Sequence, residues 1–505
     1  MTYKWQPDAC KITARKGFAF LSRFTSNTRG NVAMIFGISL LPILISVGVA
    51  IDLGRSLVVR ERLSLAIDTA ALAAGASPGL SVAAKTAYVE NYILANYTDE
   101  QIGTLGTIST SELDDVVTVH ASAALETVFL GIIGYDSLTV NVSTEVMRNI
   151  TGLELVMVLD NTGSMSGSKI SDLKTAANNL VDILYGSSEN PDLLKIGLVP
   201  FSAAVNIGTG ALAEGWMDES ADATLAQSKM NYSAGQTVWD LYDAIPNRSW
   251  NGCVEARQQP YDTTDDAPTG GDTLFQPYFA PDERSSWGYD NNYLDDGITG
   301  TTSERQMYVG KYDGTSVSSS SRGPLRGCTV DPVTRLTSDK PTLIDAINAM
   351  GAAGYTHIPV GLVWGWRLIS PDAPFTEGAA YSDTHWKKAL VILTDGENTI
   401  DSESNDNKSN YSAYGHLIEG RLGTTNASTF EDQLNTNTSL LCSRIKAEGI
   451  RVYSIAFDVT SSTVTNLMRN CASEPGLYFN SPTGAQLDAA FEAIAHDLNN
   501  LRISN

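Results

Sequence analysis

One uncharged segment constrains this chain more than any other feature. Residues 32–51 contain no acidic or basic side chain and lie between Arg29 and Asp52. At 1.5 Å per residue a helix of this length spans roughly 30 Å, the thickness of a bilayer hydrocarbon core. A cleaved secretory signal is the alternative, but its apolar region is shorter and a small-residue cleavage site followed by a loop is missing here. We therefore predict a retained transmembrane helix over residues 31–53.

The charges on the two sides of this segment differ in sign. The first 30 residues contain one acid, Asp8, and the basic residues Lys4, Lys11, Arg15, Lys16, Arg23 and Arg29. The whole chain nevertheless has a formal charge of -23, so the part after the segment is strongly acidic. The positive-inside rule predicts a single-pass protein of the bacterial inner membrane with residues 1–30 in the cytoplasm and the bulk in the periplasm. An acidic bulk disfavours nucleic acid and favours cationic surfaces or metal ions as partners.

The helical pattern continues beyond the predicted membrane span. Apolar residues recur at three- and four-residue steps as far as Gly75, which predicts one helix of about 45 residues. A short helix over 81–97 and alternating strands around 115–129 and 137–147 follow. Residues 54–150 are therefore expected to form a periplasmic helix with a small α+β module.

This N-terminal region resembles the TadE/TadG-like proteins of tight-adherence (Flp) pilus assembly. The resemblance rests on RGN-A-IF at residues 29–36 and RLSLAIDTAALAAG at residues 62–75. It implies a pilin-like architecture for the small module and a role in pilus assembly. It does not extend to prepilin processing, because Ile35 stands where a processed pilin has glutamate five residues after the cleavage glycine.

The pattern changes near residue 151, where strands and helices begin to alternate. Apolar strands are expected at 154–160, 194–205, 387–397, 451–459 and 477–480, and helices at 169–186, 342–350, 358–370, 440–449, 463–472 and 485–501. This alternation predicts an α/β domain over 151–505: an open, mainly parallel sheet with helices on both faces. Residues 206–341 form a large insertion in this scheme. A second polar loop covers 401–416, and both loops are expected either to select partners or to be solvated surface.

Three segments place oxygen ligands at one edge of the predicted sheet. They are residues 160–165, 354–356 and 394–396, and they follow strands or loops at the carboxyl end, where open α/β sheets bind ligands. Two carboxylates and three hydroxyls, with no sulfur or imidazole, suit a hard cation such as Mg2+. Gly163 allows the tight turn that directs the hydroxyls of its neighbours to one point.

These segments resemble the metal-ion-dependent adhesion site of von Willebrand factor A domains. The family's D-x-S-x-S, Thr and T-D-G elements fall on Asp160, Thr162, Ser164, Thr356 and Asp395. The resemblance implies that the three hydroxyls bind Mg2+ directly, that the two carboxylates act largely through water, and that one position stays open for a partner's carboxylate. Together with THIPVGLVWGWRLISP and RNCASEPGLYF, the motifs resemble those of TadG-like proteins in particular.

The cysteines indicate an oxidising compartment. Cys10 lies in the basic head, and the other four are distant from one another without C-x-x-C spacing, which disfavours a zinc site. We predict disulfides between Cys253 and Cys328 and between Cys442 and Cys471, the second because a helix and the segment after the next strand are neighbours in this fold. Four free buried thiols are the alternative.

These patterns predict a non-enzymatic protein that helps to assemble or anchor a pilus and binds a partner protein through the metal site. The alternative is a metal-dependent surface adhesin that binds host or matrix ligands. A phosphate-binding loop is excluded because the spacing from Gly163 to Lys169 does not fit the motif, and no nucleophile paired with a base is visible.

Overall fold

The structure is a computed structural model, and it describes residues 31–75, 82–97, 103–113, 116–147, 151–228, 236–281, 309–317, 323–402 and 407–503. The predicted cytoplasmic head, residues 1–30, lies outside this part of the chain. The chain divides into two compact units, residues 1–148 and residues 149–505, which are described separately below.

The first unit is organised by one long helix. Helix α2 (Asn31–Gly75) has 45 residues, which confirms the continuous helix expected from the sequence. Its first half is apolar and uncovered: the Ile38 side chain is 69% exposed. Its second half is amphipathic, and Leu63, Ile67 and Ala71 are fully buried in the core of the unit. The described residues contain one helix that is long and apolar enough to cross a membrane, and it is this one.

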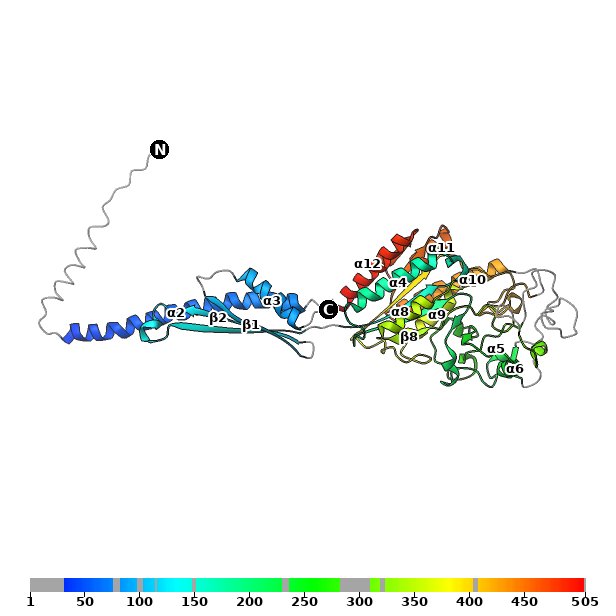
Figure 1. Ribbon diagram of the computed structural model, residues 1–505, viewed down its shortest axis with the longest axis horizontal. Coiled ribbons are helices and arrows are strands. Elements are labelled where there is room, and N and C mark those ends of the chain that lie inside the picture. The colour runs from blue at the N-terminus through cyan, green and yellow to red at the C-terminus, as the bar shows by residue number, and fades with distance from the viewer. Residues whose placement is uncertain are drawn as a thin grey trace, which may run out of the picture. The chain divides into compact units, whose positions relative to one another are not determined.

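A three-stranded antiparallel sheet and a second helix complete the first unit (Figure 1). The elements are α3 (Val82–Asn96), β1 (Thr104–Leu113), β2 (Val116–Glu126) and β3 (Ser137–Met147). Strand β2 lies in the middle and alternates between buried apolar residues such as Val119 and exposed polar ones such as His120, as a sheet with one covered face requires. Strand β1 was not predicted, because its small polar residues lack apolar alternation.

The second unit is built on a six-stranded sheet in the order β11-β10-β9-β4-β5-β8. The strands are β4 (Gly152–Asp160), β5 (Leu194–Phe201), β8 (Thr334–Thr337), β9 (Trp386–Thr394), β10 (Arg451–Phe457) and β11 (Tyr478–Ser481). All neighbouring pairs are parallel except β5 and β8. The open, mainly parallel sheet predicted from the sequence is thus confirmed.

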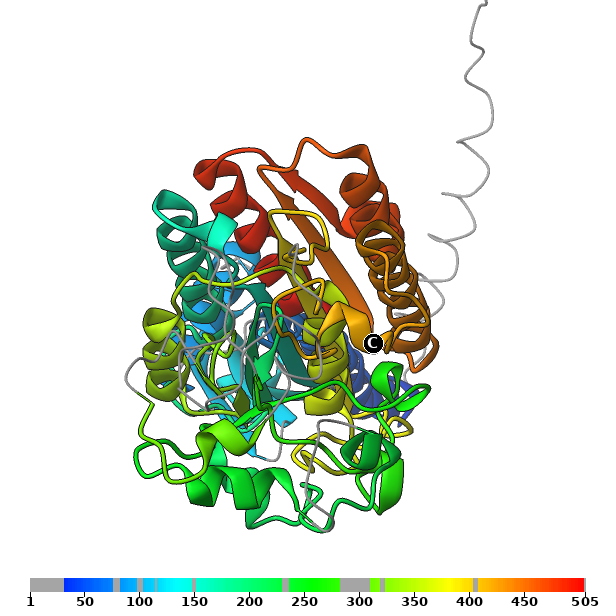
Figure 2. The same cartoon turned by 90° about the vertical axis from the view of Figure 1, so that its right-hand side faces the viewer.

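Helices cover both faces of this sheet, as Figure 2 shows. One face packs against α4 (Ser168–Tyr185), α8 (Lys340–Ala349) and α12 (Gly484–Ile503), and the other against α9 (Ile358–Ile369), α10 (Ala427–Ala447) and α11 (Ser462–Cys471). Helix α9 is apolar on all sides and entirely buried. Its Gly365 allows a close approach to β4, since an added Cβ would lie 2.4 Å from a methyl carbon of Val158. With 12 residues α9 is too short to span a bilayer and is a core helix.

The range predicted as an insertion, residues 206–341, needs one correction. Its end contains β8, which joins the main sheet as an antiparallel edge strand and is too short for its pattern to be recognised in the sequence. The rest contains β6 (Val205–Asn206), which pairs with β7 (Cys253–Val254), and the short helices α5 (Thr224–Ser228) and α6 (Val238–Ala244). The structure also joins Cys253 to Cys328 and Cys442 to Cys471 by disulfide bonds.

The second polar loop is not solvated decoration where it is described. Asn407, Ser409, Tyr414 and His416 are buried, and Tyr414 packs against Phe430 of α10. Solvated surface, one of the two alternatives for this loop, is therefore wrong for residues 407–416, and a role in selecting partners stays a prediction.

Candidate functional site

The site begins where two adjacent parallel strands end at the same edge of the sheet. Strand β4 ends at Asp160 and β9 ends at Thr394, with Leu159 and Leu393 in register. Parallel strands bring their carboxyl ends together, so residues more than 230 positions apart in sequence meet here.

Asp160 is fully buried and is held by both neighbouring segments. Its Oδ1 accepts the backbone N–H of Thr162 at 2.9 Å, and its Oδ2 accepts the hydroxyl of Thr394 at 2.7 Å. Burial and the nearby carboxylate of Asp395 raise the pKa of Asp160 to about 6. The charged form of this carboxylate is therefore under-compensated in the protein alone.

A chain of hydroxyls connects the first loop to Asp395. The Thr162 Oγ1 and Ser164 Oγ atoms lie 3.0 Å apart, and Ser164 donates its hydroxyl to Asp395 Oδ1 at 2.6 Å. Thr162 is buried, whereas Ser164 is exposed at the edge. Four of the five predicted ligand residues are thus linked by direct hydrogen bonds around one point.

The fifth predicted ligand, Thr356, lies on a loop that closes against the first. The N–H of Gly163 donates to Gly354 O at 2.9 Å, the N–H of Thr356 donates to Thr399 Oγ1 at 3.3 Å, and Thr356 O accepts the N–H of Thr399 at 2.9 Å. Ser164 and Thr356 line one open pocket of about 590 Å3. The full lining is Gly163, Ser164, Gly354, Tyr355, Thr356, Gly396, Glu397, Thr399, Ile400 and Glu431. The two acids Glu397 and Glu431 in this lining were not predicted, because they match no element of the motif.

Lys169 is a third residue of the site that was not predicted from the sequence. From the first turns of α4 its Nζ contacts Asp395 Oδ2 at 2.9 Å and Asp458 Oδ2 at 3.1 Å. The hydrogen bond and the charge of Asp395, together with those of Asp458, raise the pKa of Lys169 against the lowering effect of burial. The only sequence feature that draws attention to Lys169 is the TGSMSGSK stretch, whose spacing does not fit a phosphate-binding loop.

The chemistry of these donors fits a hard cation. Asp395 offers an oxygen beside two hydroxyls, and the raised pKa of Asp160 marks a surplus of negative charge that a cation would relieve. Within the described ranges no group of three or more His, Cys, Asp and Glu side chains is placed to hold a metal ion. A metal centre at this edge would therefore depend on hydroxyl ligands.

His357 follows Thr356 but is occupied with packing. It is fully buried between Tyr414 and Phe430, with ring centroids 6.1 Å and 5.9 Å away. Burial lowers the pKa of His357 to about 4, so the imidazole is neutral at physiological pH. The His357 ring is therefore part of the packed core next to the Thr356 loop.

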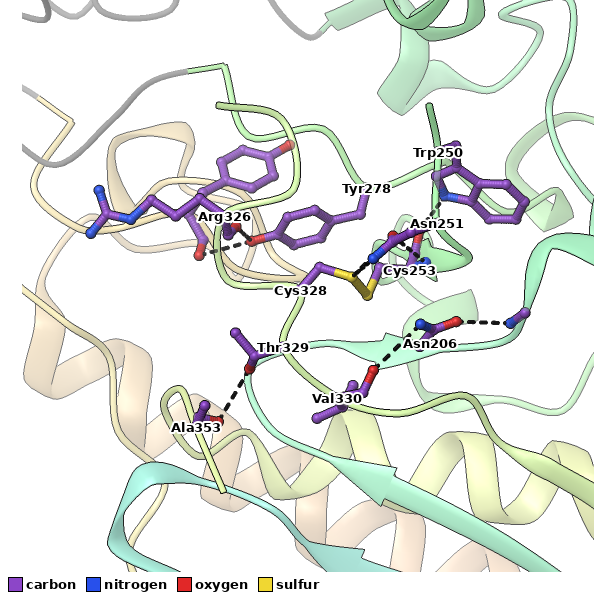
Figure 3. The surroundings of a disulfide bond; sticks show 12 residues. Asn206, Trp250, Asn251, Cys253, Tyr278, Arg326, Cys328, Thr329, Val330 and Ala353 are labelled. Atoms are coloured by element: carbon purple, nitrogen blue, oxygen red, sulfur yellow. Dashed lines mark hydrogen bonds between the residues drawn. A yellow bond between two sulfur atoms is a disulfide. The ribbon is translucent and has the colours of Figure 1, made fainter. Parts of the chain in front are cut away.

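The insertion contacts the same loop through a residue next to its disulfide. Figure 3 shows Cys253 joined to Cys328 and, one residue further, the hydroxyl of Thr329 donating to Ala353 O at 3.3 Å. Ala353 immediately precedes Gly354 of the pocket. The Thr329 hydrogen bond thus connects the insertion to the segment that carries Thr356, and the disulfide fixes the neighbouring Cys328 to Cys253 within the insertion.

Comparison with protein families gives one match. Residues 30–77 match the family model described as "Putative Flp pilus-assembly TadE/G-like". This segment of the chain is TadE/G-like. The resemblance read from residues 29–36 and 62–75 is thereby confirmed, and the match covers the apolar helix and not the second unit. No curated protein matches the sequence.

Several solved structures are similar to parts of the chain. The von Willebrand factor domain of the type V pili tip protein Mfa5 from Porphyromonas gingivalis has 11% identity and a TM-score of 0.34, covering 70% of this chain and 97% of its own. The pilus adhesin SpaC from Lactobacillus rhamnosus GG has 11% identity and a TM-score of 0.32, covering 78% of this chain and 33% of its own. A von Willebrand factor type A protein from Catenulispora acidiphila has 10% identity and a TM-score of 0.28, covering 76% of this chain and 46% of its own.

Proposed function

We propose that this chain is a membrane-anchored component of tight-adherence (Flp) pilus assembly or anchoring that holds a partner protein through a Mg2+-dependent adhesion site. The observation that carries the proposal is the presence, in one chain, of the TadE/G-like segment and of a hydroxyl and carboxylate cluster at the open edge of the sheet. A pilus machine needs such a protein to be fixed at the membrane and to bind other subunits, and the two units divide these tasks.

In this proposal residues 1–30 are cytoplasmic, residues 31–53 cross the inner membrane, residues 54–150 form the small TadE/TadG-like module, and residues 151–505 form a von Willebrand A-type domain in the periplasm. The exposed apolar half of α2 supports the span, because water would be an unfavourable neighbour for so many aliphatic side chains.

The proposed ligands of the cation are Asp160, Thr162, Ser164, Thr356 and Asp395. A divalent cation there supplies an electrophilic centre, because three of its protein ligands are neutral hydroxyls. The residues of this chain do the rest: Asp160 orients the first loop through the Thr162 N–H, and Ser164 and Thr356 face the pocket from which a partner's carboxylate would approach.

Cation binding is tested directly with Mn2+, whose electron paramagnetic resonance signal reports the free ion, on the full chain in lipid nanodiscs. Asp160→Ala is expected to abolish binding while Asp432→Ala, which removes an exposed acid of α10 outside the pocket, leaves it unchanged. Equal Mn2+ binding by the wild type and the Asp160 variant would refute the site.

Partner binding is tested by capture of envelope proteins on the same three forms, in Mg2+ and in chelator. We expect capture only by the wild type and Asp432→Ala, and only in Mg2+. Capture that persists in chelator would make the second unit a metal-independent scaffold.

The alternative, a surface adhesin for host or matrix ligands, requires exposure of the second unit outside the cell. External protease applied to intact cells distinguishes the two functions. Protection of residues 151–505 supports the assembly role, and cleavage supports the adhesin.

A further inference from the structure

The loop between β2 and β3 has an unusual composition for a hairpin connection. Residues 127–136, here called the tip loop, read TVFLGIIGYD, and their only charged side chain is that of Asp136. Hairpin connections usually consist of Gly, Asn, Asp, Pro and Ser. Most apolar side chains of the tip loop point outward, although Leu130 is buried: Ile132 is 76% exposed, and Val128, Ile133 and Tyr135 are also exposed.

A buried carboxylate fixes the tip loop to α2. Asp52 accepts three successive backbone N–H groups, from Val128 at 3.1 Å, Phe129 at 2.8 Å and Leu130 at 2.9 Å. These are the donors at the start of a 3-10 helix, Leu130–Ile133, which has no other cap for them. The tip loop therefore has a defined place beside α2, and its exposed side chains are held there by the backbone.

The attachment point sets the level of the tip loop along α2. Asp52 directly follows the uncharged run of residues 32–51, and Phe129 touches α2 one turn earlier, where an added Cβ on Gly48 would lie 2.6 Å from the Phe129 Cβ. Gly48 belongs to the uncharged run. A helix that fills the hydrocarbon core with this run therefore brings the tip loop to the edge of that core.

We propose that the tip loop is a second membrane contact, in which Ile132 and Ile133 enter the lipid beside α2 and Tyr135 lies at the interface with water. A bilayer fits this surface better than a protein partner, because Phe129 packs on Gly48 and α2 also exposes apolar side chains close to Gly48 in sequence, such as Val47 and Ile51. Aromatic residues such as Tyr favour the headgroup level.

Two points of contact have a consequence that a single helix lacks. A lone helix can rotate about its own axis in the bilayer. A helix whose side loop also enters the lipid is held in one rotational orientation. The tip loop would thus fix which way the sheet of the first unit faces. This inference rests on the proposed span of α2, so the experiment must separate the two.

The test uses single cysteines in a Cys10→Ser chain, labelled with an environment-sensitive nitrobenzoxadiazole dye and reconstituted in vesicles of phosphatidylethanolamine and phosphatidylglycerol. Ile132→Cys reports the tip loop, Ile38→Cys reports the span, and Leu72→Cys is an exposed control on α2 about 30 Å beyond Asp52. Ile133→Cys repeats the tip measurement in case Ile132→Cys folds poorly. Quenching by nitroxide-labelled lipid is compared with quenching by iodide in water.

We expect lipid quenching at Ile132 to be several-fold stronger than at Leu72, iodide quenching to be correspondingly weaker, and both to be independent of the protein-to-lipid ratio. Iodide access at Ile132 equal to that at Leu72, with Ile38 protected, overturns the second contact and leaves the span intact. Access at both Ile132 and Ile38 overturns the span and the second contact together. Protection of Ile132 that disappears on dilution in lipid assigns the surface to a second copy of the chain and also overturns the proposal.

Discussion

Asp52 and Asp160 look alike in the sequence and differ completely in the structure. Each is the first acid after a run of apolar residues, and each is fully buried. Asp52 accepts three backbone N–H groups and caps a short helix. Asp160 accepts one backbone N–H and one hydroxyl and has Asp395 close by. A carboxylate surrounded by fixed donors stabilises the fold, whereas one that faces another carboxylate has charge left over for a ligand.

The largest effect of a substitution on stability is expected at Asp52, and it tests the difference between the two aspartates directly. Asp52→Ala leaves the amides of Val128, Phe129 and Leu130 without an acceptor, which we expect to cost on the order of 3 kcal/mol in local stability. Hydrogen exchange of the tip loop, followed by mass spectrometry on the full chain in nanodiscs, should accelerate about a hundredfold. Asp52→Asn, which keeps one acceptor oxygen, should fall between. Unchanged exchange in the alanine variant would remove the structural role of Asp52.

The opposite sign is expected for the matching change at Asp160. Because the pKa of Asp160 is raised from 3.8 to about 6, the folded state holds its proton more tightly than the unfolded state. The stability of the metal-free protein therefore falls as the pH rises from about 4 to about 6 and stays lower above pH 6. Asp160→Asn should raise the free energy of unfolding in chelator at pH 7.5 by about 2 kcal/mol while weakening Mn2+ binding.

This gain should disappear below about pH 4, where Asp160 is protonated in both states of the wild type. The measurement is denaturant unfolding of both proteins at a series of pH values in chelator. A variant that is less stable than the wild type at pH 7.5 would show that Asp160, like Asp52, has a structural role.

A smaller effect is expected from the basic neighbour of the site. Lys169 holds a positive charge 2.9 Å from Asp395, where it repels an incoming cation and offsets the charge of that carboxylate. Lys169→Met should tighten Mn2+ binding several-fold, because it removes a positive charge that repels the cation. The substitution also removes one partly buried ion pair, which lowers the stability of the fold slightly. Titration of the nanodisc samples by electron paramagnetic resonance measures this affinity. Weaker binding would mean that Lys169 positions Asp395 for the cation.

The smallest effect on stability is expected at Arg55, the basic neighbour of Asp52. Arg55 lies 3.5 Å from the Asp52 carboxylate and donates to Glu126 O at 3.2 Å, with its side chain partly exposed. Arg55→Ala should lower the free energy of opening of the tip loop, measured by hydrogen exchange, by only about a few tenths of a kcal/mol, because exposed ion pairs contribute little to stability. An effect as large as that of Asp52→Ala would show that the carboxylate depends on a charged partner and not on the three N–H groups.

The sequence was sufficient wherever a pattern extended over many residues. The 45-residue helix and strands β4, β5, β9 and β10 correspond to long apolar stretches, and the two disulfides join widely separated cysteines. Of the two four-residue strands at the sheet edges, β11 was predicted and β8 was not, and β1 was missed because it is small and polar. Solvated surface, one of the two alternatives for the second polar loop, is wrong for residues 407–416, because buried polar side chains there bond to backbone groups and to the insertion, which composition does not reveal.

The candidate site divides in the same way. The sequence alone contains the order of the five proposed ligands, Asp160, Thr162, Ser164, Thr356 and Asp395. That order was enough to predict the set, and a metal-binding measurement is needed to test it. Lys169 and Glu431 could not be added from the sequence, because their approach to the set depends on how α4 and α10 pack beside the sheet, and Glu397, two residues after Asp395, matches no element of the motif. The disulfide contact through Thr329 and Ala353 depends on the path of the insertion.

By itself, the sequence determined that an uncharged run of 20 residues precedes an acidic α/β domain, because hydrophobic length and periodicity are local properties that few structures can satisfy. Only the tertiary structure decided which of two buried aspartates caps a loop and which faces another carboxylate. That outcome depends on segments 76 positions away for Asp52 and 234 positions away for Asp160. Hydrogen-bond donors at such separations are chosen by strand register and packing, which no local pattern contains.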